Sequence, residues 1–280
     1  MPLFLKRRAG VAVVEIEGVI GARVRAPVYA RLFDSVAQST RYRALLLDID
    51  SPGGSASGSE ILYRSLLRVA ERKPVVAYIR GMGASGGYYL GCAASKIVAL
   101  PTALVGSIGV IYLRPVLEQL LGKAGVEFSV FKGGRLKDMT GFWRGPTAEE
   151  GEKFQGLINE IYDNFVAVVA RSRPLDEGQV RELATGEVFT ARKGKELGLV
   201  DELGDFQDAL ELAARLGNSR PRHLPVRPKR SLSQRMFGGM GNNRGSGLPL
   251  LTAQVQRLLA GGIYYLEPSN LISDYWSEGE

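Results

Sequence analysis

The sequence predicts an α/β fold with a mostly parallel sheet, because strand-like and helix-like segments alternate along most of the chain. Two apolar runs, ALLLDID at 44–50 and PVVAYI at 74–79, read as buried central strands. Between them, residues 60–71 repeat apolar side chains at helical spacing. This order predicts two parallel strands joined by a helix that crosses over one face of the sheet.

The remaining elements continue the alternation. Shorter apolar runs predict strands at 11–16, 96–100 and 126–131. Helical spacing predicts helices at 27–38, 88–94, 113–124, 147–172, 176–184, 191–197 and 205–216. The long helix opens with TAEE, in which Thr147 and Glu150 have the spacing of a capping box.

The composition is that of an ordinary globular protein, with 280 residues, 45% of them hydrophobic and 23% charged. Cys92 is the single cysteine, so no internal disulfide can form and nothing indicates an oxidising compartment. The basic start MPLFLKRRAG lacks the apolar stretch of a secretory signal. The uncharged run at 97–113 contains the helix breaker Pro101, so we read it as strand, turn and strand instead of a membrane span.

The net charge of +7 is concentrated near the C-terminus. Between residues 212 and 266 there are nine Arg or Lys and no Asp or Glu. Because this charge lies on a Pro-, Gly- and Arg-rich tail, we do not expect a nucleic-acid-binding protein. We predict a folded domain over 1–216 and a basic extension over 217–280, disordered in part.

Two interpretations of the extension stay open. It is either a solvated tail or a peripheral contact with an anionic membrane, to which Tyr264, Tyr265 and Trp276 would contribute. Residues 248–266 predict one more short helix. We therefore expect the protein to be cytoplasmic or peripheral on the cytoplasmic membrane.

Ser85 lies in a glycine-rich turn, in RGMGASGGYY at 80–89, between a predicted buried strand and a helix. A serine at such a junction presents its hydroxyl on a sharp turn. The N–H groups of Gly86 and Gly87, at the start of the helix, can stabilise an oxyanion. Alone, this pattern is more typical of a plain structural turn than of a catalytic one.

A second glycine-rich turn, DSPGGS at 50–55, follows the neighbouring buried strand. Open α/β sheets place their sites at the carboxyl ends of such strands. Gly53 and Gly54 offer a second backbone N–H beside the first turn. The two turns together predict an oxyanion hole next to a serine nucleophile.

The general base is the open question for Ser85. His223 is the single histidine and lies in RPRHLPVRP, a poor place for a rigidly held catalytic imidazole. The remaining base for a serine is a lysine made neutral by burial. Among the ten lysines, the predicted elements leave Lys96, Lys132 and Lys137 as candidates.

Four ordered motifs resemble the signal peptide peptidase A (SppA) family of serine peptidases, within the ClpP/crotonase-like superfamily. They are DSPGGS at 50–55, GASGGYYLGCAASKIVA at 83–99, GSIGV at 106–110 and FKGGRLKDM at 131–139. The resemblance implies a ClpP/crotonase-like fold with repeated β-β-α units. It also implies a homo-oligomeric ring or dome in which neighbouring subunits complete each site.

The resemblance assigns roles to residues of this chain. Ser85 matches the nucleophile, Lys137 the general base, and Ser107 a serine that positions this lysine. Gly54 and Gly86 match the oxyanion-hole donors. The implied activity is that of a serine endopeptidase with a Ser–Lys dyad and no cofactor or metal, which degrades signal peptides or other hydrophobic peptides.

Two details qualify the resemblance. Asp138 stands next to Lys137, and we expect it to face away because neighbours on an extended strand point to opposite faces. Family members usually carry an amino-terminal membrane anchor, for which this sequence has no candidate segment.

Two alternatives belong to other classes. A crotonase-like acyl-CoA hydratase or isomerase would need active-site carboxylates, for which Glu60 is the one candidate in place. A catalytically inactive, membrane-associated scaffold would not need Ser85 and Lys137, both of which are present.

Overall fold

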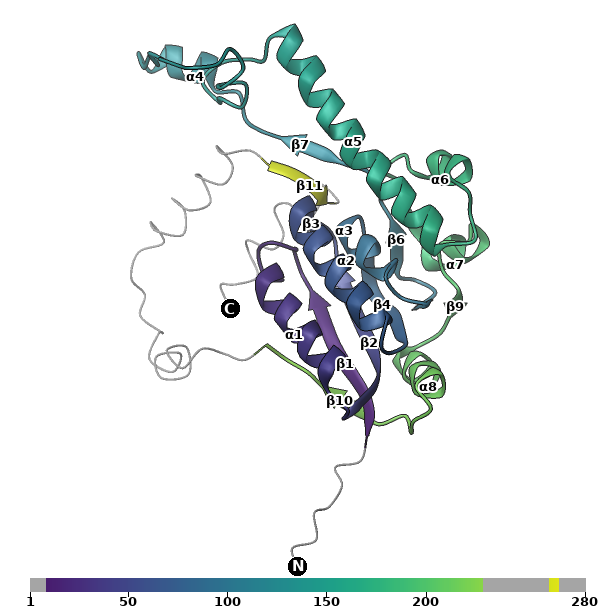
Figure 1. Cartoon of the computed structure of the whole chain (residues 1–280). Coiled ribbons are helices and arrows are strands. Elements are labelled where there is room, and N and C mark those ends of the chain that lie inside the picture. Colours follow the sequence, from purple (N-terminus) through teal and green to yellow (C-terminus); the bar gives the residue numbers. More distant parts are fainter. Residues whose placement is uncertain (1–8, 229–261, 267–280) are drawn as a thin grey trace, which may run out of the picture. The chain divides into compact units, whose positions relative to one another are not determined.

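A computed structural model of the chain describes residues 9–228 and 262–266 (Figure 1). The described residues fall into two compact units. The first contains residues 9–110, 162–228 and 264–266, and the second contains residues 111–161 and 262–263. The chain leaves the first unit after Val110 and returns to it within a long helix.

The first unit is built on a mostly parallel sheet with the strand order β10-β1-β2-β4-β5-β9. These strands are β1 (Gly10–Glu17), β2 (Tyr42–Ser51), β4 (Val75–Ala84), β5 (Lys96–Ala99), β9 (Glu202–Leu203) and β10 (His223–Pro225). In addition, β6 (Leu104–Gly106) pairs in parallel with β4, and β8 (Val188–Thr190) pairs antiparallel with β6. The mixed α/β class with a central sheet is thus confirmed, and the two apolar runs form β2 and β4.

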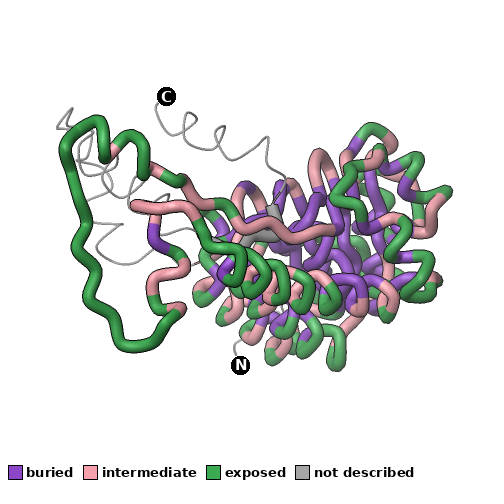
Figure 2. The backbone as a smooth tube through the Cα atoms, turned by 90° about the horizontal axis from the view of Figure 1, so that it is seen from above, coloured by how far each residue is buried: buried purple, intermediate pink, exposed green. Residues whose placement is uncertain are grey.

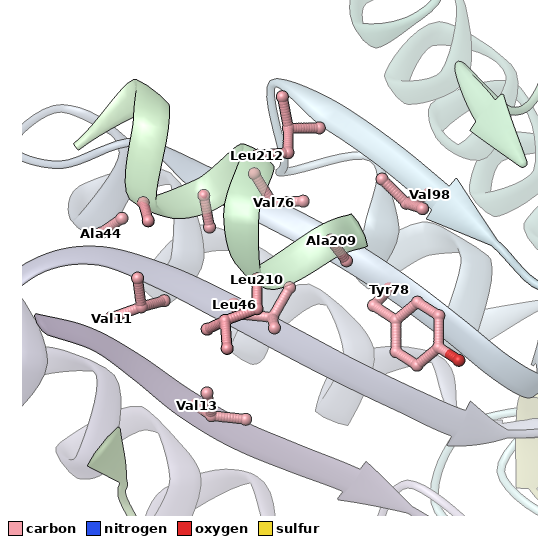
Figure 3. Close-up of a cluster of buried hydrophobic side chains, with 12 residues drawn as sticks. Val11, Val13, Ala44, Leu46, Val76, Tyr78, Val98, Ala209, Leu210 and Leu212 are labelled. Atoms are coloured by element: carbon pink, nitrogen blue, oxygen red, sulfur yellow. The ribbon is translucent and has the colours of Figure 1, made fainter. Parts of the chain in front are cut away.

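One face of the sheet is covered by α8 (Phe206–Leu216) (Figure 3). On this face of the sheet, every second side chain along the strands is apolar and packs against the buried side of α8. The cluster comprises Val11, Val13, Ala44, Leu46, Val76, Tyr78, Val98, Ala209, Leu210, Leu212, Ala213 and Ala214. Full burial of one aliphatic side chain of this size contributes about 1.5–3 kcal/mol, so this cluster accounts for much of the rigidity of β1, β2 and β4.

The short helix α3 (Gly86–Gly91) lies on the other face of the sheet. Gly91 packs against Ile49, Ala77 and Ile97, which alternate along their strands with the residues of the α8 cluster. Helix α2 (Ala56–Ala70) contacts α3 and also α1 (Ala26–Gln38). The α3 side of the sheet therefore carries the two glycine-rich turns.

The second unit contains β7 (Ile111–Leu113), α4 (Glu118–Lys123) and the first part of α5 (Ala148–Ser172). The capping box at the start of α5 is confirmed: Thr147 N–H donates to Glu150 Oε2 at 2.8 Å, and Glu150 N–H donates to Thr147 Oγ1 at 3.2 Å. Much of this unit's backbone is exposed, whereas the strands of the sheet are buried (Figure 2).

Two expectations for this region need correction. The helix predicted at 113–124 forms only over α4, and the strand predicted at 126–131 is wrong. Residues 126–131 are exposed and have no neighbouring strand within the described part of the chain. A strand needs a partner for its backbone N–H and C=O groups, which an apolar run cannot supply by itself.

The C-terminal elements α6 (Glu177–Leu183) and α7 (Ala191–Glu196) agree with prediction. The helix predicted over 248–266 is wrong at its end, because Gly262–Leu266 form strand β11. β11 pairs antiparallel with β3 (Gly53–Ser55). The rest of that segment, and Trp276, lie outside the described residues.

No helix within residues 9–228 is long and apolar enough to cross a bilayer.

Candidate active site

Ser85 occupies the turn between β4 and α3, and the structure holds its backbone on both sides. Its N–H donates to Gly106 O at 2.8 Å, and its carbonyl accepts from Tyr89 N–H at 2.8 Å. The side chain is almost fully buried, with 1% exposure. Its φ of 51° and ψ of −117° lie in a region that residues with a Cβ rarely adopt. Such strain persists only where surrounding contacts impose it, and it is concentrated at functional sites.

Two buried tyrosines anchor α3 and explain the sequence GGYY after Ser85. Tyr88 OH donates to Leu199 O at 2.8 Å. Tyr89 OH donates to Glu60 and accepts from Asn164 Nδ2 at 2.9 Å. Because these hydroxyls are satisfied, both rings can be buried completely. The start of α3, and with it the turn at Ser85, is therefore fixed.

The DSPGGS turn is held by Ser51. Ser51 Oγ donates to Gly18 O at 2.7 Å and accepts from Gly53 N–H at 3.2 Å. Ile20 N–H donates to Gly53 O at 2.7 Å, and Ser55 N–H donates to Ile20 O at 2.8 Å. These bonds use the polar groups on both sides of Gly54, whose own N–H and C=O point to the opposite side of β3.

The two glycine-rich turns lie side by side. Ser51 at the end of β2 pairs with Gly83 near the end of β4, and β3 contacts α3. A Cβ added at Gly87 would lie 2.7 Å from Ser51 O, so the turns approach more closely there than a side chain allows. Gly54 and Gly86 thus belong to neighbouring elements that follow the carboxyl ends of β2 and β4.

Ser107 is brought close to Ser85 through β6. Gly106, the last residue of β6, pairs with Ala84, the last residue of β4, so Ser107 and Ser85 follow the ends of adjacent parallel strands. Ser107 also has a positive φ, 49°, and its N–H donates to Glu187 O at 2.7 Å. The first unit therefore gathers Ser85, Ser107 and the glycine turns at the same ends of its strands.

Lys137 lies in the second unit, in a turn where its N–H donates to Gly134 O at 3.2 Å. Its side chain is exposed. The expectation that Lys137 and Asp138 lie on an extended strand is wrong. Asp138 instead accepts from Lys132, which holds the pKa of Asp138 below its ordinary value. Its other oxygen lies 3.1 Å from Arg144 Nη2.

Lys132 and Lys96 are both engaged in ion pairs. Lys132 pairs with Asp138, and Lys96 Nζ lies 3.1 Å from Asp201 Oδ1. Both amino groups are therefore already engaged by a carboxylate. Of the three candidate lysines, Lys137 has no ion pair within the described ranges.

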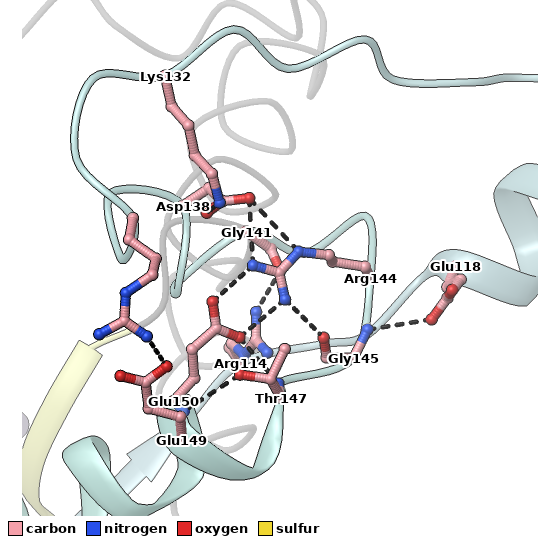
Figure 4. Close-up of polar contacts among 11 residues, drawn as sticks. Arg114, Glu118, Lys132, Asp138, Gly141, Arg144, Gly145, Thr147, Glu149 and Glu150 are labelled. Atoms are coloured by element: carbon pink, nitrogen blue, oxygen red, sulfur yellow. Dashed lines mark hydrogen bonds and ion pairs between the residues drawn. The ribbon is translucent and has the colours of Figure 1, made fainter.

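Charged side chains line a cavity of about 580 Å³ in the second unit. Arg144 makes a two-pronged pair with Glu150, at 2.8 and 2.6 Å, and Arg135 pairs with Glu149 (Figure 4). Arg144 lowers the pKa of Glu150 to about 2. Lys137 is not among the residues that line this cavity.

His223 lies far along the sheet from Ser85. It begins β10 and pairs with Val11 at the amino end of β1, whereas Ser85 follows the carboxyl end of β4. Its exposed ring contacts Phe206, with the ring centroids 5.5 Å apart. Since β1 and β4 belong to one parallel sheet, His223 and Ser85 are at opposite ends of the strands.

Sequence reasoning missed Arg80, which joins three strand ends beneath the turns. Arg80 reaches Glu17 at 3.0 Å, Asp48 at 3.2 Å and Asp50 at 3.4 Å. Asp50 also accepts from Met82 N–H at 3.0 Å. Two features of the sequence could have indicated this cluster. Arg80 opens the Ser85 motif, and Asp48 and Asp50 alternate at the end of the preceding strand.

The described part of the chain contains no cluster of three or more His, Cys, Asp or Glu that could hold a metal ion. Burial raises the pKa of Cys92 to about 11, so its thiol stays protonated.

Comparison with known proteins places the chain among peptidases. The profile of peptidase family S49 matches residues 68–220. The chain is 37% identical to the Synechocystis protein slr0021, whose name describes a protease, over 85% of this chain and 86% of the relative. It is 34% identical to the chloroplastic serine protease SPPA of Arabidopsis thaliana, over 75% of this chain and 32% of the relative. It is also 36% identical to protease 4 of Salmonella typhi, over 66% and 30% respectively.

Proposed function

The chain belongs to peptidase family S49, the family of SppA serine peptidases, and we propose that Ser85 and Lys137 form its catalytic dyad. The backbone of Ser85 is the observation that carries the proposal. Ser85 is buried and has a positive φ, and hydrogen bonds to Gly106 and Tyr89 hold its backbone in one orientation at the carboxyl end of β4. Ser85 is thus the nucleophile of a serine-type peptidase.

Gly54 and Gly86 supply the oxyanion hole in this proposal. The N–H of Gly86 opens α3 and has no partner within the helix. The N–H of Gly53 is used by Ser51, which leaves Gly54 as the donor from the DSPGGS turn and Gly53 as its support. Two fixed N–H groups stabilise a developing oxyanion because they need no reorganisation during the reaction.

Lys137 acts as the general base and Ser107 positions it. A lysine accepts a proton only as the neutral amine, which withdrawal from water favours. The exposed Lys137 side chain therefore requires enclosure, by bound peptide or by a neighbouring subunit, before it acts. Ser107 supports this assignment because it stands beside Ser85 at the ends of adjacent strands.

The reaction is acyl transfer. Lys137 Nζ takes the proton of Ser85 Oγ while the oxygen attacks the scissile carbonyl carbon. The tetrahedral oxyanion is held by Gly54 and Gly86, and collapse breaks the C–N bond as the lysine returns its proton to the leaving amine. Water, deprotonated by the same lysine, then hydrolyses the acyl-enzyme and releases Ser85.

The substrates are peptides, and we propose signal-peptide remnants or other hydrophobic segments as their class. A relative from Enterococcus faecium is named as a signal peptide peptidase SppA, which supports this choice. The α/β sheet with its site at the strand ends supports a ClpP/crotonase-like fold. Residues 1–216 would form the peptidase domain, and 217–280 an extension whose β10 joins the sheet.

Cleavage of a mixed peptide library, mapped by mass spectrometry, tests the function. The wild-type chain is expected to cut next to small or apolar residues, and Ser85→Ala to cut nothing. Lys137→Ala should lower kcat by about 10²–10⁴-fold, the usual contribution of a general base. Lys132→Ala is the matched control, and loss of activity only in that variant overturns the choice of Lys137.

We also propose a homo-oligomer, a ring or dome, in which neighbouring subunits complete each site. The second unit exposes large apolar side chains, led by Phe131 at 95% and Leu120 at 63%, which a partner subunit would cover. Mixing the inactive Ser85→Ala and Lys137→Ala chains tests sharing of the dyad. Recovered activity indicates that Ser85 and Lys137 come from different subunits, and no recovery places both in one chain.

The basic extension is proposed as a peripheral contact with anionic membranes, on the cytoplasmic side. Its eight cations provide the attraction, at about 1 kcal/mol per cation near the surface. The full chain should sediment with phosphatidylserine vesicles at low salt and stay in solution with phosphatidylcholine vesicles. Equal sedimentation with both would contradict the proposal.

No observation favours the alternative functions. Glu60, the carboxylate that acyl-CoA chemistry would need, accepts from Tyr89 and pairs with Arg64.

A further inference from the structure

A bulge interrupts β4 shortly before the turn that carries the nucleophile. In the parallel pairing of β2 with β4, Ile49 lies opposite Ile79. The next pair is Ser51 opposite Gly83, so Asp50 alone faces three residues of β4. Bulges recur next to active sites, where they re-aim a side chain. The register between the two glycine-rich turns is therefore set at this bulge.

The carboxylate of Asp50 lies in the bulge and meets all three of its residues. Its Oδ1 accepts from Met82 N–H at 3.0 Å, and Arg80 Nε lies 3.4 Å from its Oδ2. A Cβ added at Gly81 would lie 2.7 Å from Oδ1 and 3.1 Å from Cγ. The carboxylate thus occupies the space that a side chain at position 81 would need.

The main chain of Asp50 belongs to the other glycine-rich turn, DSPGGS. Gly18 N–H donates to Asp50 O at 2.9 Å, and Gly18 O accepts from Ser51 Oγ at 2.7 Å. Ser51 in turn accepts from Gly53 N–H. Asp50 therefore holds the start of the DSPGGS turn through its backbone and the approach to Ser85 through its side chain.

The bulge determines how far β4 carries Ser85 along the sheet. A strand advances about 3.3 Å per residue, so two extra residues paired regularly would move Ser85 by about 6.6 Å. Because two is an even number, the side chains of β4 would keep their faces and only the distance along the strand would change. A misplacement of about 1 Å at a reacting group can cost about 10²-fold in rate. Even a partial change at the bulge is enough to separate Ser85 from Gly54 N–H.

We propose that Asp50 is a positioning residue of the peptidase, whose carboxylate sets the distance between Ser85 and the oxyanion donor Gly54. It acts by accepting the N–H of Met82 inside the bulge. Its negative charge, which pairs with Arg80, is not required for this role. The inference rests on the proposed function, because it takes Ser85 and Gly54 as parts of the site.

Two substitutions of Asp50 separate the hydrogen bond from the charge. Asp50→Asn keeps an oxygen that accepts from Met82 N–H, and Asp50→Ala removes both the acceptor and the charge. The assay uses the full chain and the library peptide that wild type cleaves fastest. In Asp50→Ala, kcat is expected to fall about 10–10²-fold with KM within about twofold, since only transition-state contacts are lost. Asp50→Asn should stay within about threefold of wild type. Equal losses in both variants, or an unchanged kcat in Asp50→Ala, would overturn the inference.

Gly81→Ala tests the same carboxylate by crowding it. The φ of Gly81 is not positive, so alanine fits the backbone, but its methyl group must push the Asp50 carboxylate out of the bulge. The kcat should therefore fall as in Asp50→Ala. In a chain that already carries Asp50→Ala, the space is vacant and Gly81→Ala should change kcat by less than about twofold. Losses that multiply in the double variant would show that the two residues act separately, against the inference.

Asp176→Ala and Gly178→Ala are the matched controls. Asp176 accepts from Gln179 N–H at 2.8 Å at the start of α6, and a Cβ at Gly178 would lie 3.1 Å from Asp176 Oδ1. Loss of this cap should lower the stability measured in urea but leave kcat unchanged, because α6 carries no residue of the site. If the controls lower kcat as much as Asp50→Ala does, the effect is general destabilisation and Asp50 has no positioning role.

Failure of the inference is distinguishable from failure of the proposed function. Cleavage that survives Ser85→Ala would overturn the proposed function, and the inference with it. Cleavage that Ser85→Ala abolishes and Asp50→Ala leaves unchanged would overturn the inference alone.

Discussion

Ser85 and Ser107 both have a positive φ, at 51° and 49°, although neither is a glycine. The two residues follow the ends of paired strands, and the backbone of each is bonded to a neighbouring segment. The backbone position of each serine is thus fixed. A nucleophile positioned in this way needs only a base and a substrate to react, which is the basis of the assignment of Ser85.

Gly54→Ala should strongly reduce peptide cleavage, because it displaces the N–H proposed to bind the oxyanion. The φ of 149° is unfavourable for alanine, and the new Cβ would lie 2.1 Å from Ile20 O, so the turn must move. Loss of one oxyanion donor costs about 10²–10³-fold in kcat. Steady-state kinetics and circular dichroism at 222 nm separate loss of catalysis from unfolding.

Gly156→Ala is the control for that substitution. Gly156 lies in α5 and a Cβ there meets nothing within 4 Å, so alanine should stabilise the helix by about 0.5–1 kcal/mol. Unchanged cleavage in Gly54→Ala would contradict the placement of the oxyanion hole.

Cys92 should resist thiol reagents in the folded protein. Its side chain is buried and burial raises its pKa to about 11, so little thiolate exists at pH 8. Reaction with 5,5′-dithiobis(2-nitrobenzoate) should be slow in buffer and fast in denaturant, in wild type and in Ser85→Ala alike. Rapid reaction of the native chain would show that α3 is not packed as described.

At the scale of elements, Arg80 connects the carboxyl ends of β1, β2 and β4. One guanidinium serves Glu17, Asp48 and Asp50, three carboxylates that would otherwise repel one another. Burial raises the pKa of Asp48 above its ordinary value, while Arg80 opposes that rise. Because both glycine-rich turns start from these strand ends, the cluster supports the backbone of the site.

Arg80→Met should lower the free energy of unfolding by about 1–3 kcal/mol, since it removes the arginine partner of Asp48 and Asp50. Arg64→Met is the matched control, because Arg64 makes an exposed i,i+4 pair with Glu60 worth under about 0.5 kcal/mol. Urea denaturation measures both. Equal effects of the two substitutions would remove Arg80 from its supporting role.

Elements made by local patterns were predictable, and those made by distant partners were not. The apolar runs of β2 and β4 and the capping box of Thr147 are visible in short stretches of sequence. By contrast, no hydrophobic pattern in the sequence predicts that residues 264–266 pair with the glycine-rich strand β3. Likewise, the apolar run at 126–131 looked like a strand because a sequence does not show whether a partner strand exists.

At the scale of the whole molecule, the proposed dyad is divided between the two compact units. Ser85, Ser107 and the oxyanion glycines belong to the first unit, and Lys137 belongs to the second. The places of Ser85 and of the two glycine turns could be predicted from the sequence, because strand ends in a parallel sheet meet at one edge. Ser107 was indicated only by the family resemblance. The sequence could not select Lys137 by physics alone, since the exposed turn around it carries no pattern of burial.

The stability of the second unit should fall in acid. Arg144 lowers the pKa of Glu150 to about 2, below its ordinary 4.5, so the stabilisation is complete above pH 4.5 and is lost as pH falls toward 2. Glu150→Gln should flatten the pH dependence of unfolding between pH 5 and 2.5. Glu149→Gln, at the exposed pair with Arg135, should leave it unchanged. Parallel curves for wild type and Glu150→Gln would contradict this account.

Covalent labelling with a fluorophosphonate tests the central claim, that Ser85 works with Lys137, most directly. After digestion and mass spectrometry, a single adduct on Ser85 is expected in wild type and in Lys132→Ala. The adduct should be absent in Ser85→Ala and should form at least about 10²-fold more slowly in Lys137→Ala. An adduct on another residue, or labelling of Ser85 that is equally fast without Lys137, would contradict the dyad.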